Sequence, residues 1–244
     1  MIPRVMRSCS KLNLDGRNMG RLFAKASSQY AELTASVPSA EPMTLSCWYN
    51  ATDFATAPIC LAVHSGTTSG LKLGFTTGGA VQIVATDSGG SNGVANSSTN
   101  TTAGTWAHAL GTTSANNSRS AYLNAFGLQT NTTPITLSGL SKYVLGANYN
   151  GGSRNFYANG VIADAAVWNV ALSSQEILAL SQGISPLLIR PASLVFYAPL
   201  WGEMSPELNL RGAGVTLGAA GAAPTLSPLH PRIYQGGRSV GVVI

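Results

Sequence analysis

The chain has 244 residues, of which 45% are hydrophobic and only 9% are charged. This composition, which includes 27 glycines, excludes a set of charged surface helices and favours β-structure with many tight turns. A net charge of +5 is concentrated near the N-terminus, while the rest of the chain is neutral, and the length suits one large sandwich with extensions better than two small domains.

Residues 1–27 are predicted to form a basic N-terminal arm. Its candidate anchoring residues are spaced along the segment at Arg4, Arg7, Lys11, Arg17 and Arg21. Spaced cations of this kind occur in solvated termini, and they also suit an arm that docks onto an acidic surface of a partner protein. Direct nucleic-acid binding is not expected, because a duplex binder concentrates positive charge on a folded face.

The cysteines and the N-terminal residues indicate in which cellular compartment the protein is made. Cys9, Cys47 and Cys60 cannot make a complete disulfide framework, and an odd number argues against passage through an oxidising compartment. The first residues lack the apolar core of a signal peptide. No apolar run approaches the roughly 18–20 residues of a membrane span, so no membrane association is expected. We therefore expect a protein made in the cytoplasm of its host cell.

Residues 28–200 contain the pattern of a β-domain. Alternating hydrophobic and polar residues predict strands at 29–36, 43–50, 59–64, 71–76, 80–85, 106–112, 120–125, 142–147, 161–168 and 193–200. Turn signals such as Asn150-Gly-Gly152 and Asn159-Gly160 separate them. Many short strands at this spacing indicate a two-sheet antiparallel sandwich.

One short helix is predicted after residue 168. Ser173 and Glu176 have the spacing of a capping box, in which each side chain pairs with the backbone N–H of the other residue. Ile177 stands on the apolar side of this helix, and Gly183 followed by Pro186 ends it. We expect the helix to close the sandwich.

Residues 201–244 are predicted to form an extended C-terminal tail. Its segment from 212 to 224 is rich in Gly, Ala and Pro and has little capacity to build a core of its own. The tail can complete the sheet of its own domain or supply a strand to a neighbouring subunit.

Four segments of the chain resemble the laminin-G and concanavalin A-like jelly-roll superfamily: Gly104-Thr-Trp-Ala-His108, Ala121-Tyr-Leu-Asn-Ala-Phe-Gly127, Tyr143-Val-Leu-Gly146 and the run from Asn159 to Ile177. The resemblance implies an all-β jelly-roll sandwich of the concanavalin A type. Such sandwiches serve as lectins, adhesins, glucanases and structural shells, so the function has to be sought in particular residues.

Catalytic residues are not predicted. Glycoside hydrolysis needs two carboxylates about 5–10 Å apart, whereas this chain has nine acidic residues and no predicted strand carries two of them. The histidines His64, His108 and His230 are too scattered to suggest a triad or a metal site. We therefore expect a protein that is not an enzyme.

No cofactor is predicted either. Calcium prefers several oxygen ligands, most of them carboxylates. Asp53, Asp87 and Asp164 are the only aspartates within the predicted domain core, and they do not cluster along the sequence. A bound calcium ion is compatible with the family resemblance but is not expected.

A candidate ligand-binding loop lies at residues 148–155. Carbohydrate recognition combines an aromatic platform with planar polar side chains on exposed loops, and Asn148, Tyr149, Asn150 and Arg154 supply that composition. The alternative is a polar hairpin turn without a ligand, because Asn-Gly turns are frequent in β-proteins.

The sandwich, the basic arm and the low-complexity tail together favour a subunit of a larger assembly, because segments that cannot fold alone gain order against neighbours. The region from Ile184 to His230 also resembles laminin-G-like proteins of tailed bacteriophages, which implies a virion structural protein. Its expected partners are major capsid or tail proteins and further copies of itself in a trimer or dimer. The alternative is an adhesin or tail-fibre protein that recognises polysaccharide on a host surface.

Overall fold

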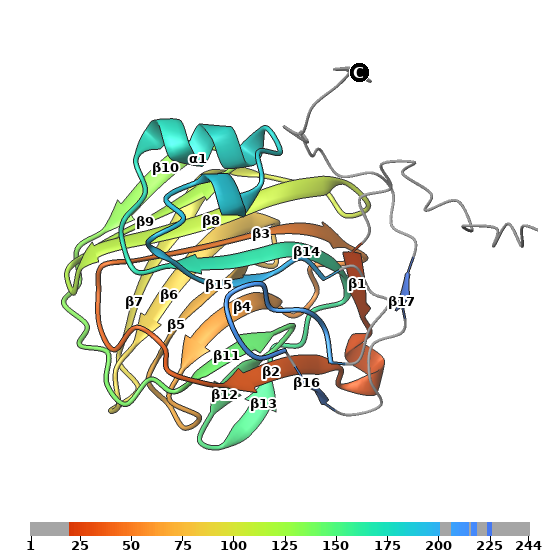
Figure 1. The fold of residues 1–244 in the computed structure, drawn as a ribbon, viewed down its shortest axis with the longest axis horizontal. Helices are drawn as coiled ribbons and strands as arrows, with labels where there is room; N and C mark the ends of the chain where they lie inside the picture. The colour runs from red at the N-terminus through yellow and green to blue at the C-terminus, as the bar shows by residue number, and fades with distance from the viewer. Residues whose placement is uncertain (1–19, 201–205, 215, 219–223, 226–244) are drawn as a thin grey trace, which may run out of the picture.

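The computed structural model describes residues 20–200, 206–214, 216–218 and 224–225 of the chain. Over these residues the chain forms two antiparallel sheets that pack face to face, with one short helix outside (Figure 1). The predicted fold class, a two-sheet antiparallel jelly-roll sandwich with one short helix, is therefore confirmed.

The first sheet has the strand order β10 (Phe126–Asn131), β9 (Ser118–Leu123), β8 (Trp106–Ala115), β3 (Met43–Ala51), β14 (Gly160–Trp168), β1 (Gly20–Phe23) and β17 (Pro224–Thr225), and β15 (Leu194–Ala198) also pairs with β14. The second sheet has the order β16 (Thr216–Gly218), β2 (Tyr30–Thr34), β11 (Lys142–Leu145), β4 (Ile59–His64), β5 (Gly70–Phe75), β6 (Ala80–Thr86) and β7 (Asn92–Asn100). The remaining elements are the hairpin of β12 (Asn148–Asn150) and β13 (Ser153–Asn155), the helix α1 (Ser174–Ser181), and the short 3-10 helices η1 (Lys25–Ser27) and η2 (Pro186–Leu188).

Strands β7 and β10 were not expected from the sequence. On β7 the buried residues are Gly93, Ala95 and Ser97, which alternate with exposed residues. Because these inward residues are small or polar, the hydrophobic period of a strand is too weak to recognise. Strand β10 has no buried residue, so no alternation of buried apolar and exposed polar residues marks it.

The main core lies between the two sheets. Strands β4, β5 and β6 supply large side chains such as Leu61, Leu73 and Ile83, whereas the facing strand β8 supplies Ala109 and Gly111. A Cβ atom at Gly111 would lie 2.6 Å from Ile83 Cδ1. The sheets therefore approach closely because a bulky residue on one side meets glycine on the other.

Helix α1 begins as predicted. The backbone N–H of Ser173 donates to Glu176 Oε2 at 2.7 Å, and the capping box is complete. Ile177 and Leu180 pack against Trp168 on the outer side of the first sheet. The helix thus buries a second apolar cluster and leaves the outer face of the second sheet to the β12–β13 hairpin.

The folded body begins earlier than the predicted boundary at residue 27. Strand β1 pairs with β14, and the Arg21 side chain is buried and donates to Glu207 Oε1 at 2.7 Å. Arg21 therefore contributes to the interior of its own domain, not to a charged arm, because Glu207 neutralises it. The other four predicted anchoring residues, Arg4, Arg7, Lys11 and Arg17, lie outside the described residues.

The described part of the tail returns to both sheets of its own domain. Strand β16 pairs with β2 in the second sheet, and β17 pairs with β1 in the first. Asn209 Oδ1 accepts a hydrogen bond from the backbone N–H of Tyr197 at 3.2 Å. The tail was expected either to complete the sheet of its own domain or to supply a strand to a neighbouring subunit. The described segments complete the sheets of their own chain.

Candidate functional site

The outer face of the second sheet carries a groove of about 350 Å³. The β12–β13 hairpin folds onto this face, where Tyr149 packs with Ala62 of β4 and Val144 of β11. The hairpin therefore forms one wall of the groove, and strands β5, β6 and β7 form the floor. The floor residues are Lys72, Gln82, Val84, Thr86, Asn92 and Val94.

Strand alternation explains why polar side chains line this floor. On β5, Leu71 and Leu73 point into the core, so residues 70, 72 and 74 face outward. Both of the other outward positions are glycines, which leaves Lys72 as the side chain that β5 presents. A Cβ at Gly74 would lie 2.2 Å from the Pro58 carbonyl oxygen, so position 74 requires glycine for the backbone at Pro58 to pass this close.

Lys72 is a buried cation on the groove floor. Its side chain is 7% exposed, and Nζ donates to Thr86 Oγ1 at 2.7 Å. The Thr86 hydroxyl donates onward to Asn92 Oδ1 at 2.6 Å. Burial lowers the pKa of Lys72 from 10.5 to about 8, so the amine is mainly protonated at neutral pH.

The wall of the groove adds amides and one exposed aromatic ring. Asn148 donates through Nδ2 to Asn155 Oδ1 at 3.1 Å, while Asn148 Oδ1 is buried and has no hydrogen-bond partner among the residues that the structure describes. Asn150 is exposed. Phe156 is 47% exposed and has a φ of 50°, a conformation that aromatic residues rarely adopt. Its backbone is held against β4 by a hydrogen bond to Ile59.

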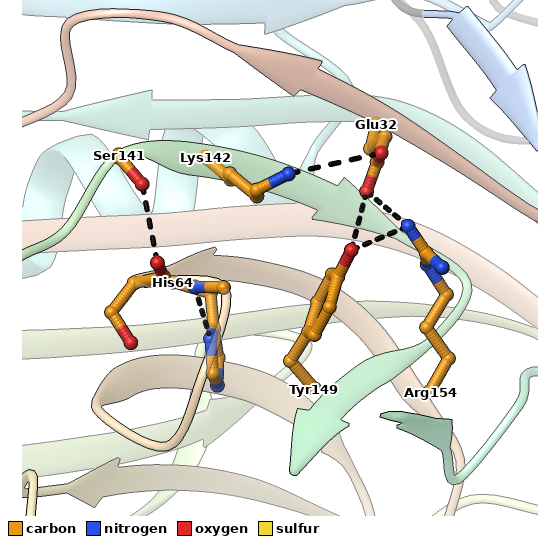
Figure 2. Close-up of polar contacts among 8 residues, drawn as sticks. Glu32, His64, Ser141, Lys142, Tyr149 and Arg154 are labelled. Atoms are coloured by element: carbon orange, nitrogen blue, oxygen red, sulfur yellow. Dashed lines mark hydrogen bonds and ion pairs between the residues drawn. The ribbon is translucent and has the colours of Figure 1, made fainter. Parts of the chain in front are cut away.

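The other two predicted residues of the loop, Tyr149 and Arg154, form a separate cluster. Figure 2 shows both side chains converging on Glu32 of β2. Tyr149 donates to Glu32 Oε2 at 3.2 Å, and Arg154 Nη2 donates to the same oxygen at 2.7 Å. The Arg154 guanidinium also lies 3.9 Å from the ring centroid of Tyr30, and Lys142 Nζ lies 3.9 Å from Glu32 Oε1.

This cluster fixes the hairpin on the sheet. The Tyr149 ring was expected to be an exposed platform, but it is 6% exposed because it packs on His64 and its hydroxyl pairs with Glu32. Burial, followed by the charge of Glu32, raises the pKa of Tyr149. The exposed aromatic residue beside the groove is Phe156. The predicted loop is thus divided: Asn148 and Asn150 line the groove, whereas Tyr149 and Arg154 lie behind it with Glu32, in a cluster that supports the hairpin.

His64 belongs to that support. It is fully buried under Tyr149, with ring centroids 5.6 Å apart, and its Nδ1 accepts a hydrogen bond from the Gly66 backbone at 3.1 Å (Figure 2). Burial, and then the positive charge of Lys72, lower the pKa of His64 to about 4. The imidazole is therefore neutral at physiological pH.

A second polar cluster lies beneath helix α1. His108 Nε2 is 2.8 Å from Ser46 Oγ, and Tyr197 donates to Asp164 Oδ1 at 2.7 Å. Ser46, His108 and Asp164 line a cavity of only about 10 Å³. This volume holds one water molecule at most, so the three residue types of a hydrolytic triad have no room for a substrate here.

The described residues contain neither a metal-binding cluster nor a helix that could span a membrane. No group of three or more His, Cys, Asp or Glu side chains within this part of the chain could hold a metal ion. In the same residues, no helix has both the length and the apolar character needed to cross a membrane.

Sequence reasoning missed Lys72, Gln82, Thr86, Asn92 and Phe156. Lys72 is the one charged residue in an otherwise apolar strand, with glycines two positions before and after it. This pattern is visible in the sequence and could have marked Lys72 as a candidate. The other floor residues become neighbours only through the pairing of β5, β6 and β7.

The two-sheet antiparallel jelly roll is a sandwich of the concanavalin A type, with a polar groove on one outer face. The chain belongs to the concanavalin A-like lectin/glucanases superfamily, whose family model matches residues 25–178. A search of curated proteins finds no match.

Several solved structures share the fold. A native heptameric SAP-like pentraxin from Limulus polyphemus has a TM-score of 0.58 and 16% identity, covering 83% of this chain and 95% of the pentraxin chain. A putative carbohydrate binding protein from Bacteroides ovatus has a TM-score of 0.57 and 14% identity, covering 84% of this chain and 60% of the other. The Ruminococcus gnavus IT-sialidase CBM40, bound to α2,3 sialyllactose, has a TM-score of 0.51 and 17% identity, covering 63% and 97%. At these identities the likeness concerns the fold.

Proposed function

We propose that this chain is a carbohydrate-binding domain and that the saccharide lies in the groove between the β12–β13 hairpin and strands β5–β7. The observation that carries the proposal is the combination in one groove of the exposed Phe156 ring with amide side chains from Gln82, Asn92 and Asn150. The groove volume of about 350 Å³ lies in the range of small-molecule sites, roughly 300–1,000 Å³.

The chemistry of the groove suits a sugar ring. A pyranose has an apolar face of C–H groups, which an aromatic ring such as Phe156 can cover, and a rim of hydroxyls that need donors and acceptors. Gln82 donates through Nε2 to the Phe75 carbonyl at 2.9 Å, which leaves its Oε1 to accept from a hydroxyl.

The comparisons support the class of function. Of the proteins that share the fold, one is a putative carbohydrate binding protein and another, the IT-sialidase CBM40, is bound to α2,3 sialyllactose. Catalytic groups are not part of the proposal, since the groove lining has no carboxylate among its described residues.

Glycan-array binding tests the proposal. The wild-type protein should bind at least one saccharide class, and Phe156→Ala should weaken that binding about tenfold or more, since burying a large apolar side chain such as Phe contributes about 1.5–3 kcal/mol. Leu188→Ala is the matched control, because Leu188 is 54% exposed on η2 and does not line the groove. Absence of any glycan binding, or equal binding by Phe156→Ala, would rule the groove out.

A narrower proposal concerns the setting in which the domain works. We propose a virion structural protein, bound to capsid or tail proteins and present as a trimer or dimer; the support is the resemblance of residues 184–230 to phage laminin-G-like proteins. None of the similar structures named above is a virion protein. Deletion of residues 1–19, which spares strand β1, should abolish binding to isolated phage particles if the arm is the anchor, and unchanged binding would refute that role.

A further inference from the structure

Lys72 lacks the anionic partner that a buried ammonium group normally has. An ammonium carries three N–H donors, and the structure gives Lys72 one acceptor, the neutral hydroxyl of Thr86. Among the described residues no carboxylate forms an ion pair with it. Buried charges are usually compensated by a counter-charge or by several hydrogen bonds, so Lys72 departs from the rule.

The other buried cations of the domain show the contrast. Arg21 pairs with Glu207 at 2.7 Å. Arg119 has no carboxylate in hydrogen-bond contact, but it donates to three oxygens, from Asn116, Asn131 and Thr133, at 2.6 to 2.8 Å. Arg21 therefore has an anionic partner and Arg119 has several acceptors inside the protein, whereas Lys72 has one neutral acceptor and faces a groove.

A second hydrogen-bond donor, the Asn92 amide, lies beside Lys72 on the groove floor. The Thr86 hydroxyl accepts a hydrogen bond from Lys72 and donates one to Asn92 Oδ1, so that the Nδ2 donors of Asn92 are left to face other acceptors. Both side chains line the groove. The floor thus presents one ammonium and one amide NH₂, a donor set that suits an anion with two oxygens.

We propose that the groove selects an anionic saccharide, whose singly charged carboxylate or sulfate ester is bound by Lys72 and Asn92 while Phe156 covers the sugar ring. This inference rests on the proposed carbohydrate-binding function and names the ligand class for the same groove. A single negative charge matches the single cation of the floor. A free inorganic anion should bind more weakly than the saccharide, because it has no ring for Phe156 to cover.

Matched pairs of saccharides test this inference. The probes are oligoglucuronate with its carboxyl-reduced counterpart, and a 6-sulfated galactoside with its unsulfated form. Wild-type protein should bind the charged member of at least one pair about tenfold more tightly, as expected for a charge-assisted hydrogen bond. The pair that shows this preference identifies carboxylate or sulfate as the bound group.

Lys72→Met and the pH dependence connect the preference to this residue. The variant should lose the charged-over-neutral preference, so that the ratio of the two affinities falls to about one. In the wild type the preference should also fall between pH 7 and pH 9.5, because the pKa of Lys72 is about 8. His64 on β4 is already neutral in this range, Thr86 and Gln82 on β6 do not titrate, and the pKa of Tyr149 on the hairpin is raised above 10.

The outcomes separate the two proposals. Equal wild-type affinity for charged and neutral saccharides, or a preference that survives both Lys72→Met and high pH, would overturn the anionic ligand while leaving carbohydrate binding in place. Binding of no saccharide of either kind would overturn both. The pH measurement uses wild-type protein, so the test does not depend on the folding of the variant.

Discussion

Replacing Lys72 by Met should stabilise the protein at pH 6. The pKa of Lys72 falls from 10.5 to about 8 through burial, and each tenfold change in proton affinity corresponds to about 1.4 kcal/mol, so the buried charge opposes folding by at most about 3 kcal/mol. Loss of the hydrogen bond to Thr86 offsets about 1 kcal/mol of this. Methionine is unbranched and similar in length, so it fills the same space. The expected net gain in the free energy of unfolding is about 2 kcal/mol.

The gain should depend on pH with a defined sign. Between about pH 8 and 10.5 the unfolded chain holds a proton on Lys72 that the folded protein has released, so the wild type gains stability relative to the variant as pH rises. Below pH 8 the difference should be constant. Urea denaturation of both proteins, followed by tryptophan fluorescence at pH 6, 8 and 10, measures the difference in their free energies of unfolding. Groups that titrate in the same way in both proteins do not contribute to this difference.

Lys142→Met is the matched control for this experiment. Lys142 is half-buried on β11 and lies 3.9 Å from Glu32, so its removal should change stability by less than about 1 kcal/mol. A Lys72→Met protein that is less stable than the wild type at pH 6, or a difference that does not shrink toward pH 10, would refute the argument that Lys72 is an uncompensated buried charge.

Three further predictions concern the frame around the groove. Arg21→Met should lower the free energy of unfolding by about 3–5 kcal/mol, because it removes the cation that faces the buried Glu207 carboxylate. Urea denaturation should show that a second change, Glu207→Leu, restores most of the loss, and no recovery would argue against the ion pair. The buried His64 has a pKa of about 4 against 6.5 in the unfolded chain, so stability present above pH 6.5 should fall as pH drops toward 4, and His64→Gln should lack this component in acid titrations. Gly160→Ala should lower the melting temperature clearly, because the added Cβ atom would lie 2.2 Å from a backbone oxygen of β3. Gly104→Ala is the control: no atom lies within 4 Å of its added Cβ, so the melting temperature should fall only through the strain of a φ of 80°. Equal losses in the two variants would contradict the steric argument.

The sequence was sufficient for the fold and for helix α1. The capping box at Ser173 depends on residues three apart, and local spacing is visible in a sequence. The position of Tyr149 could not be predicted in the same way. Its burial depends on Glu32, which lies more than a hundred residues away and reaches the hairpin only because β2 pairs with β11.

The groove shows the same limit. Lys72, Thr86 and Asn92 come from three successive strands, and their hydrogen-bonded chain exists only in the observed register. A lysine in an apolar strand is visible in the sequence, but its depth and its lack of a counter-charge are not. Asn148 and Asn150, which line the groove, could be grouped from the sequence because a hairpin turn keeps neighbours in sequence close together in space.

The ion pair between Arg21 and Glu207 also has a consequence for biosynthesis. Strand β1 is among the first described segments to leave the ribosome, yet it pairs with β14 and β17, and the partner of its buried arginine is 186 residues further along. Pairings of such long sequence separation form late, because the entropy of loop closure must be overcome before the contact stabilises the chain. The nascent chain therefore has to keep β1 unpaired and protected from aggregation until almost the whole domain has been synthesised.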